Sequence, residues 1–237
     1  MADGWREVFE RSRLIPPPSQ TVRLAGENHL SQSQGFQLNL SRVTAPHLSQ
    51  VIPHSRHVTY QLRVTLFDRN HQHFFGKTWR SSPQKMKNKK IAFNEVLYFY
   101  TSLLLPSTLM VLELVSLPPR PDGSHQALGR GFTILELFTN KPEIPATDGD
   151  RRLSLHHGSP RGLLHPLLKD TIIDGAHLDC VVKKHPALVS MMHLLPENVL
   201  VSGDEEIPAH HHLGLTLTPL RQTWCRCALG GWCGVPA

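Results

Sequence analysis

The sequence predicts an all-β fold, an antiparallel β-sandwich of about eight strands. Apolar residues recur at every second position in short runs, which is the period of a half-buried strand. Turn-forming residues separate these runs, and the chain holds 19 prolines and 16 glycines, more than a helical bundle tolerates. The hydrophobic share of 40% is enough for a sizeable core.

The first 35 residues are expected to precede the sandwich. Trp5, Val8 and Phe9 have helical spacing after Asp3, a residue suited to cap a helix. The three prolines at 16–18 end this pattern, and residues 16–35 are typical of a linker. The sequence therefore predicts a short N-terminal helix followed by a Pro-rich linker, either docking a partner or covering the neighbouring domain.

The sandwich itself is expected over residues 36–184. The candidate strands are 36–40, 58–66, 74–81, 91–101, 109–115, 131–138, 152–156 and 177–183. Residues 109–115 are almost all apolar, which is typical of a strand buried on both faces. The expected buried residues include Phe93, Leu97, Leu112, Leu114, Phe132 and Ile134.

Beyond residue 184 the pattern loosens. Residues 185–208 carry three prolines and are expected to form an extended lead-out. Residues 209–237 have no strong periodic core face, so we expect a disordered tail.

The charge of the chain and its targeting signals limit which partners and which cell compartment are expected. The formal net charge of +6 is a mild excess that permits acidic partners but does not indicate nucleic acid. We expect a soluble protein of a reducing compartment, because we find no apolar signal segment, no run suited to a membrane span and no disulfide framework.

No pattern of catalytic residues is evident, so we expect a protein that is not an enzyme and holds no cofactor. Ser159 lies beside His157, but Pro160 follows it directly, which does not fit a nucleophile elbow and favours a polar turn. The histidines at 210–212 and the cysteines at 225, 227 and 233 lack the spacing of a zinc site. No metal site is expected.

One strand resembles the central strand of C2 domains. Phe93-Asn94-Glu95 is followed by Val96-Leu97-Tyr98-Phe99, and the central strand of C2 domains typically carries an aromatic-Asn-Glu sequence followed by alternating apolar residues. Calcium-binding members of that family place several aspartates on two loops, because Ca²⁺ needs six to eight oxygen ligands. Here the loops supply only Asp68 and Asp122, so a calcium-independent C2-like sandwich is expected.

A basic run precedes the same strand. Lys85, Lys87, Lys89 and Lys90 place four positive charges within six residues. We expect them to bind an acidic protein surface or anionic lipid head groups. The alternative is a solvated loop that keeps a sheet edge soluble, and the sequence leaves both open.

Several longer stretches resemble the N-terminal region of the nephrocystin-4 family. They are residues 5–9, 73–79, 93–103, 157–168, 185–188 and 193–203, and the resemblance runs in order from about residue 5 to residue 208. From residue 209 the chain departs from the family, as a truncated product, an alternative ending or an incomplete gene model would.

This resemblance implies a non-enzymatic scaffold at the ciliary transition zone and basal body, also associated with cell junctions and the cytoskeleton. It implies roles in cilium assembly and in Hippo and Wnt signalling. The implied partners are nephrocystin-1 and the ciliary protein that resembles the retinitis pigmentosa GTPase regulator-interacting protein. The alternative function is a peripheral membrane module that binds phosphoinositides without calcium.

Overall fold

The computed structural model describes residues 33–48, 58–71, 73–119, 126–138, 148–158, 160, 171–188, 192 and 195–203. The expected N-terminal helix and the expected tail over residues 209–237 lie outside the described residues. Within the described part, no helix is long and apolar enough to cross a membrane.

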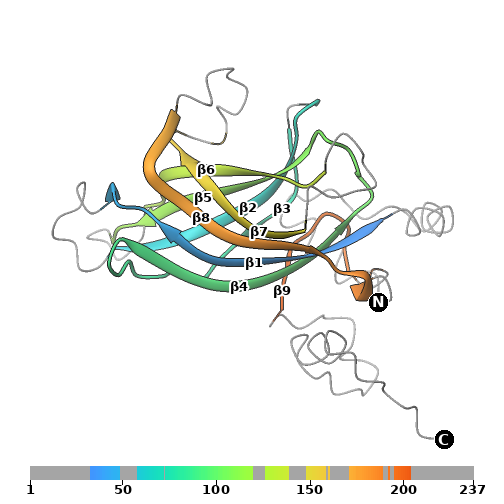
Figure 1. The fold of residues 1–237 in the computed structure, drawn as a ribbon, viewed down its shortest axis with the longest axis horizontal. Coiled ribbons are helices and arrows are strands. Elements are labelled where there is room, and N and C mark those ends of the chain that lie inside the picture. The colour runs from blue at the N-terminus through green and yellow to red at the C-terminus, as the bar shows by residue number, and fades with distance from the viewer. Residues whose placement is uncertain are drawn as a thin grey trace, which may run out of the picture.

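The described residues form nine antiparallel strands, which confirms the all-β sandwich (Figure 1). The strands are β1 (Gln34–Thr44), β2 (Thr59–Asp68), β3 (His73–Arg80), β4 (Lys90–Thr101), β5 (Thr108–Leu117), β6 (Leu128–Glu136), β7 (Gly149–His156), β8 (Ile172–Lys184) and β9 (Val201–Ser202). Each of the eight expected strands overlaps one of β1 to β8.

The strands lie in the order β3-β2-β5-β6-β7-β8-β1-β4-β9. The link between β6 and β7 is narrow, because only Phe132 and His156 pair across it. The sheet therefore folds there into two layers, and Figure 1 shows β7, β8, β1 and β4 in front of β6, β5, β2 and β3. Between β1 and β4, in contrast, ten residue pairs are in register.

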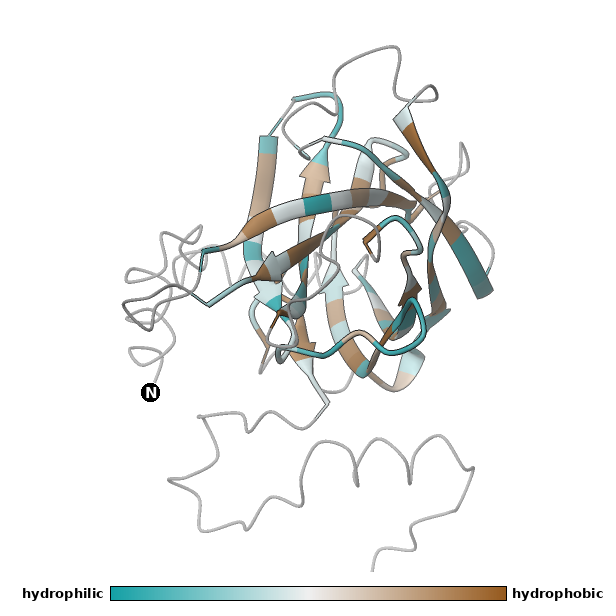
Figure 2. Cartoon of the chain, turned by 90° about the vertical axis from the view of Figure 1, so that its left-hand side faces the viewer, coloured by the Kyte–Doolittle hydropathy of each residue, from teal (hydrophilic) through white to brown (hydrophobic). Residues whose placement is uncertain are grey.

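The core fills the space between the two layers. Phe36, Leu38 and Leu40 of β1 are fully buried, as their alternation predicts, and the ring of Phe36 stacks on Phe99 with centroids 5.1 Å apart. Figure 2 shows the hydrophobic bands alternating with polar ones along several strands. Burial of such alternating faces is the main force that holds a sandwich together.

A second, smaller apolar cluster lies on the other side of β5. It joins Phe67, Leu109, Val111 and Phe132, with Ile134 packed against it. Five of the six residues expected to be buried are at most 5% exposed, whereas Ile134 is only partly buried. Ile134 is more exposed than expected because it packs against the edge of this smaller cluster and not in the space between the layers.

The described part of residues 185–208 packs onto the sandwich, and its residues 195–203 lie between the two outer strands β3 and β4. Val199 pairs with Lys77 of β3, and Val201 pairs with Tyr98 of β4. The Tyr100 hydroxyl donates a hydrogen bond of 2.9 Å to the Leu195 carbonyl. We call residues 195–203 the closing segment, because they join the edges of the two layers opposite the β6–β7 link.

Candidate functional site

The loop that carries the basic run is tied to the sandwich at its base. Gln84 exchanges two backbone hydrogen bonds with Tyr60 of β2, of 2.7 and 2.8 Å. The Met86 side chain packs against the hydrophobic core. The loop between β3 and β4 is therefore anchored at Gln84, just before the first lysine, and at Met86, between the first two lysines.

The tip of this loop is a tight hairpin turn. Lys87 and Lys90 exchange backbone hydrogen bonds of 2.8 and 2.9 Å, and the two residues between them, Asn88 and Lys89, have φ angles of 50° and 63°. Positive φ at both central positions defines a type I′ turn, whose twist matches antiparallel strands. Asn suits this conformation, whereas Lys adopts it at a cost of about 1 kcal/mol.

The side chains of Lys85, Lys87, Lys89 and Lys90 are all exposed. Within the described residues none of them forms an ion pair. The Lys89 carbonyl accepts a 2.9 Å hydrogen bond from the Ala45 amide, which holds the turn against the end of β1. We call residues 85–90 the basic hairpin: a fixed backbone that presents four positive charges to solvent.

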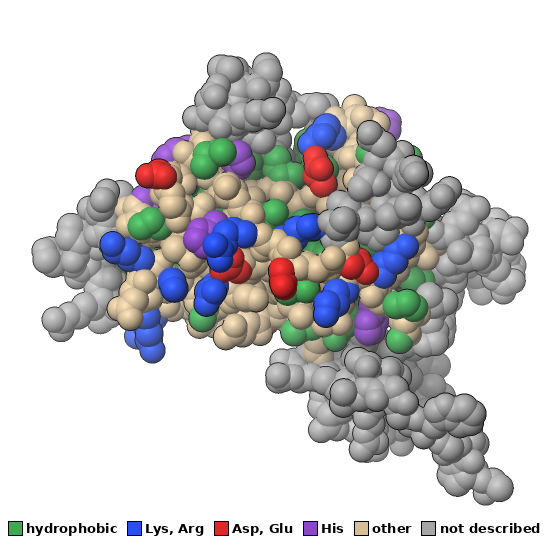
Figure 3. Space-filling view, viewed as in Figure 1, with side chains coloured by type: hydrophobic (Ala, Val, Ile, Leu, Met, Phe, Trp, Pro, Cys, Tyr) green, Lys and Arg blue, Asp and Glu red, His purple; other side chains and the backbone are tan. Residues whose placement is uncertain are grey.

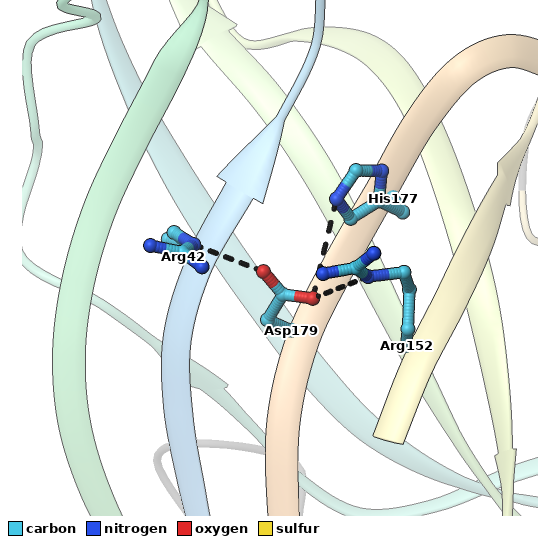
Figure 4. Close-up of polar contacts among 4 residues, drawn as sticks. All are labelled: Arg42, Arg152, His177 and Asp179. Carbon is cyan, nitrogen blue, oxygen red and sulfur yellow. Dashed lines mark hydrogen bonds and ion pairs between the residues drawn. The ribbon is translucent and has the colours of Figure 1, made fainter. Parts of the chain in front are cut away.

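A second charged group lies on the outer face of the front layer (Figure 4). Asp179 of β8 lies between two arginines: Arg42 Nε on β1 donates to its Oδ2 at 2.9 Å, and Arg152 Nε on β7 donates to its Oδ1 at 3.0 Å. His177 Nε2 lies 4.0 Å from Asp179 Oδ1. We call Arg42 and Arg152 the arginine pair, and Asp179 the carboxylate between them.

The electrostatics of Asp179 follow from this geometry. Partial burial alone would raise the pKa of its carboxyl, but hydrogen bonds from Arg152 and Arg42 outweigh that effect and hold the pKa below its ordinary value. Asp179 therefore stays ionised and holds both guanidinium groups through their Nε atoms.

A β-bulge places Arg42 on this outer face. Leu40 pairs with Cys180 and Arg42 pairs with Asp179, so Ser41 is an extra residue on β1. Before the bulge Phe36, Leu38 and Leu40 point inward, and after it Val43 does. Without the extra residue, the side chain at position 42 would point into the core, because a one-residue shift reverses the two faces of a strand.

The basic hairpin and the arginine pair are neighbours on one surface. Lys90 of β4 pairs with Thr44 of β1, and Thr44 pairs with His177 of β8. The next outward-facing row of paired residues across β4, β1, β8 and β7 consists of Ala92, Arg42, Asp179 and Arg152. Figure 3 shows Lys and Arg side chains gathered on this face, with fewer acidic ones among them. The two groups are thus neighbours, one at the end of the sandwich and one on its face, with the acidic residues Asp179 and Asp150 on the same face.

Comparison with known proteins identifies sequence relatives of this chain. No protein-family model matches the chain. Among the curated proteins that match it, human nephrocystin-4 is 42% identical over 218 residues, covering 87% of this chain, and nephrocystin-4 of Xenopus laevis is 40% identical over 218 residues, covering 86%.

The chain is similar to the N-terminal region of nephrocystin-4. It spans about 15% of the length of each of these relatives. The resemblance to the nephrocystin-4 family stated from the sequence is thereby confirmed. Because most of each relative lies outside the matched part, the likeness concerns this region of nephrocystin-4.

The structure also places the other candidates of this nephrocystin-4-like chain. Both carboxylate oxygens of Asp68 are engaged in the turn after β2, where Oδ1 accepts from the Asn70 amide at 2.8 Å and Oδ2 is 2.6 Å from His71 Nδ1. Asp122 lies outside the described residues, as do Ser159 and the His and Cys residues of the tail. Among the described residues, no group of three metal-binding side chains is brought together.

Cys180 is the only cysteine in the described part of the chain. Burial raises the pKa of its thiol to about 12, so the thiol is protonated at neutral pH. This buried thiol belongs to the core and does not act as a nucleophile.

Sequence reasoning missed the arginine pair. The alternation of His177, Leu178, Asp179 and Cys180 does indicate that His177 and Asp179 share an outer face. No comparable signal exists for Arg42, because its direction depends on the bulge at Ser41. Arg152 was within an expected strand, but only the pairing of β7 with β8 brings it to Asp179.

Proposed function

We propose that this chain is a non-enzymatic protein-interaction module of a nephrocystin-4-like scaffold, and that the basic hairpin binds an acidic surface of a partner protein. The single observation that supports this proposal is the fixed type I′ hairpin, whose four exposed lysines form no ion pair with any described residue. The similarity to nephrocystin-4 supports the scaffold part of the proposal.

Within the described residues, no acidic side chain relieves the mutual repulsion of the four lysines. Lys85, Lys87, Lys89 and Lys90 repel one another, so an acidic surface that neutralises them lowers their electrostatic energy. The hairpin backbone is already ordered, so binding does not have to order it. An acidic partner therefore gains the attraction at little conformational cost.

By the same similarity we propose the cellular setting. The module acts at the cilium base, in the transition zone and basal body, with further sites at cell junctions and the cytoskeleton. There it supports cilium assembly and the regulation of Hippo and Wnt signalling. The proposed partners are nephrocystin-1 and the ciliary protein that resembles the retinitis pigmentosa GTPase regulator-interacting protein.

The second candidate function is a peripheral membrane module without calcium. The same four lysines favour it, because each lysine near an anionic bilayer contributes about 1 kcal/mol. The two functions differ in which ligand the lysines prefer, a folded acidic surface or a sheet of lipid phosphates.

A paired experiment tests both. The full chain and its K85Q/K87Q/K89Q/K90Q variant are used to pull down full-length nephrocystin-1 and, separately, are floated with neutral and anionic liposomes. We expect the parent to retain nephrocystin-1, the variant to retain at least tenfold less, and neither to float strongly. If the parent floats with anionic but not with neutral liposomes, the membrane function is favoured. If both chains retain nephrocystin-1 equally, the hairpin is excluded as the docking surface.

A further inference from the structure

The arginine pair has donors that its own ion pairs leave unused. Arg42 and Arg152 each contact Asp179 through Nε, and within the described residues their terminal guanidinium nitrogens have no partner. The Arg42 and Arg152 side chains are 51% and 69% exposed, whereas Asp179 is 18% exposed. Two guanidinium groups are thus held on either side of one carboxylate, with their remaining donors directed to solvent.

The spacing of the surface is that of an extended peptide. Lys90 lies one row from Arg42, because Lys90 pairs with Thr44, and Arg42 and Thr44 are two residues apart on β1. Two residues of extended chain span about 7 Å, and four span about 13 Å. A group bound between Arg42 and Arg152 lies over Asp179 of β8, which is two strands, or about 10 Å, from Lys90 of β4. With the two-residue offset along the strands, Lys90 is about 12 Å from that group, which is the length of three to four residues of extended chain.

The chemistry of the pair favours a phosphoryl group. A phosphate monoester carries close to two negative charges at neutral pH and three acceptor oxygens. Planar guanidinium groups bind such oxygens in pairs, which a lysine cannot do. Asp179 lowers the net charge of the pair to one, so a singly charged carboxylate gains less here than a dianion does.

We propose that Arg42 and Arg152 bind a phosphoserine or phosphothreonine of an acidic peptide segment, while the basic hairpin binds acidic residues three or four positions along that segment. This inference rests on the proposed function, since it names the kind of acidic partner that the module takes. Asp179 acts as the positioning residue that keeps the two guanidinium groups apart and oriented.

The test uses the full chain and two synthetic peptides of one sequence, with acidic residues three and four positions after a serine that is either phosphorylated or free. Fluorescence anisotropy measures the affinity of each peptide for the parent and for R42Q/R152Q. We expect the parent to prefer the phosphorylated peptide at least tenfold, and R42Q/R152Q to reduce this preference below about twofold. The matched control R69Q/R80Q removes two charges from exposed positions on the other layer and should keep the preference.

Two further variants separate the inference from the proposed function. K85Q/K87Q/K89Q/K90Q should weaken both peptides alike and keep the preference for phosphate. R42K/R152K keeps the charge but not the planar donors, so it should lose most of the preference even if R42Q/R152Q does not fold. An unchanged preference in R42K/R152K would overturn the phosphate site while leaving the basic hairpin proposal intact.

Two controls concern the source of the phosphate. Inorganic phosphate at millimolar concentration should not compete with the phosphorylated peptide, because it lacks the acidic residues that contact the lysines. Vesicles of phosphatidylcholine with a phosphoinositide should bind more weakly than the peptide. Equal affinity of the parent for both peptides, or tight binding to these vesicles without peptide binding, would contradict the inference.

Discussion

At the scale of single residues, Asp179 is the carboxylate on which the geometry of the outer face depends. It accepts hydrogen bonds from Arg42 and Arg152, and these lower its pKa relative to the unfolded chain. A carboxyl with a lowered folded pKa stabilises the fold above its unfolded pKa of about 3.9. That stabilisation is lost as the pH falls through the folded pKa.

The matching prediction uses D179N. Because both arginines are largely exposed, the two ion pairs together are expected to contribute about 0.5–1 kcal/mol at neutral pH. Denaturant unfolding of the parent and D179N should show this difference at about pH 7, and the difference should vanish well below about pH 3.9. A difference that grew on acidification would show that the pairing does not hold Asp179 ionised.

Asp68 leads to a prediction about calcium. Its carboxylate already accepts from the Asn70 and His71 amides and contacts the His71 ring, so it orders the β2–β3 turn. A Ca²⁺ site needs six to eight oxygens, and the sequence provides no further acidic cluster in these loops. The melting temperature of the full chain should therefore stay within about 1 °C when millimolar calcium is added. A larger upward shift would reveal a site.

At the scale of secondary structure elements, the strand pattern was predictable and its irregularities were not. The eight expected strands formed where apolar alternation, or the continuous apolar run over residues 109–115, marked the residues to be buried. Bulges escaped prediction because a bulge depends on the pairing between strands, as at Ser41. The same holds for β9, whose two residues pair with β4 only through tertiary contact.

Asn94 marks the bulge on β4 and leads to a prediction. It has a φ of 52° and lies where β4 has an extra residue opposite β1, between the pairs Arg42–Ala92 and Leu40–Glu95. Asn tolerates this left-handed conformation better than other non-glycine residues do. Asn94→Ala should lower the free energy of unfolding by about 1 kcal/mol, whereas Asn94→Gly should change it by less than about 0.5 kcal/mol. Equal losses in both would mean that the Asn94 side chain itself carries the effect.

Gly76 allows the closing segment to reach β3. Its φ is 70°, and a Cβ built on it would lie 2.0 Å from the Asn198 carbonyl oxygen. Gly76→Ala should therefore displace residues 195–203 and destabilise the chain by more than about 2 kcal/mol. Gly158, with a φ of 94° and open space around it, is the matched control, and Gly158→Ala should cost about 1 kcal/mol from backbone strain alone. Similar losses in thermal or denaturant unfolding would show that the contact with Asn198 is unimportant.

At the scale of the whole molecule, the charge distribution defines two different ends. The basic hairpin lies at the end of the sandwich where β3 leads into β4, whereas exposed Leu103 and Leu105 lie at the opposite end, where β4 leads into β5. The sequence identified the lysines because four of them fall within six residues. The sequence could not show that these lysines lie near Arg42 and Arg152, because their proximity depends on the strand order and on the bulge in β1.

The basic hairpin is proposed to be a binding surface and not merely a solvated loop. Its electrostatic attraction should weaken strongly with salt, because the Debye length falls from about 30 Å at 0.01 M to about 8 Å at 0.15 M ionic strength. The charge-matched control R69Q/R80Q/K183Q/K184Q removes four exposed positive charges away from the hairpin. The hairpin variant and this control should fold alike, since exposed substitutions usually change stability by less than about 0.5 kcal/mol.

The most direct test measures the affinity of the full chain for an acidic peptide at these two ionic strengths. We expect the parent and the charge-matched control to bind alike at the lower ionic strength and to lose at least tenfold in affinity at the higher. We expect K85Q/K87Q/K89Q/K90Q to bind at least tenfold more weakly than both at the lower ionic strength. If the hairpin variant instead bound as the parent does, or if the control lost as much affinity as the hairpin variant, the basic hairpin would not be the binding surface.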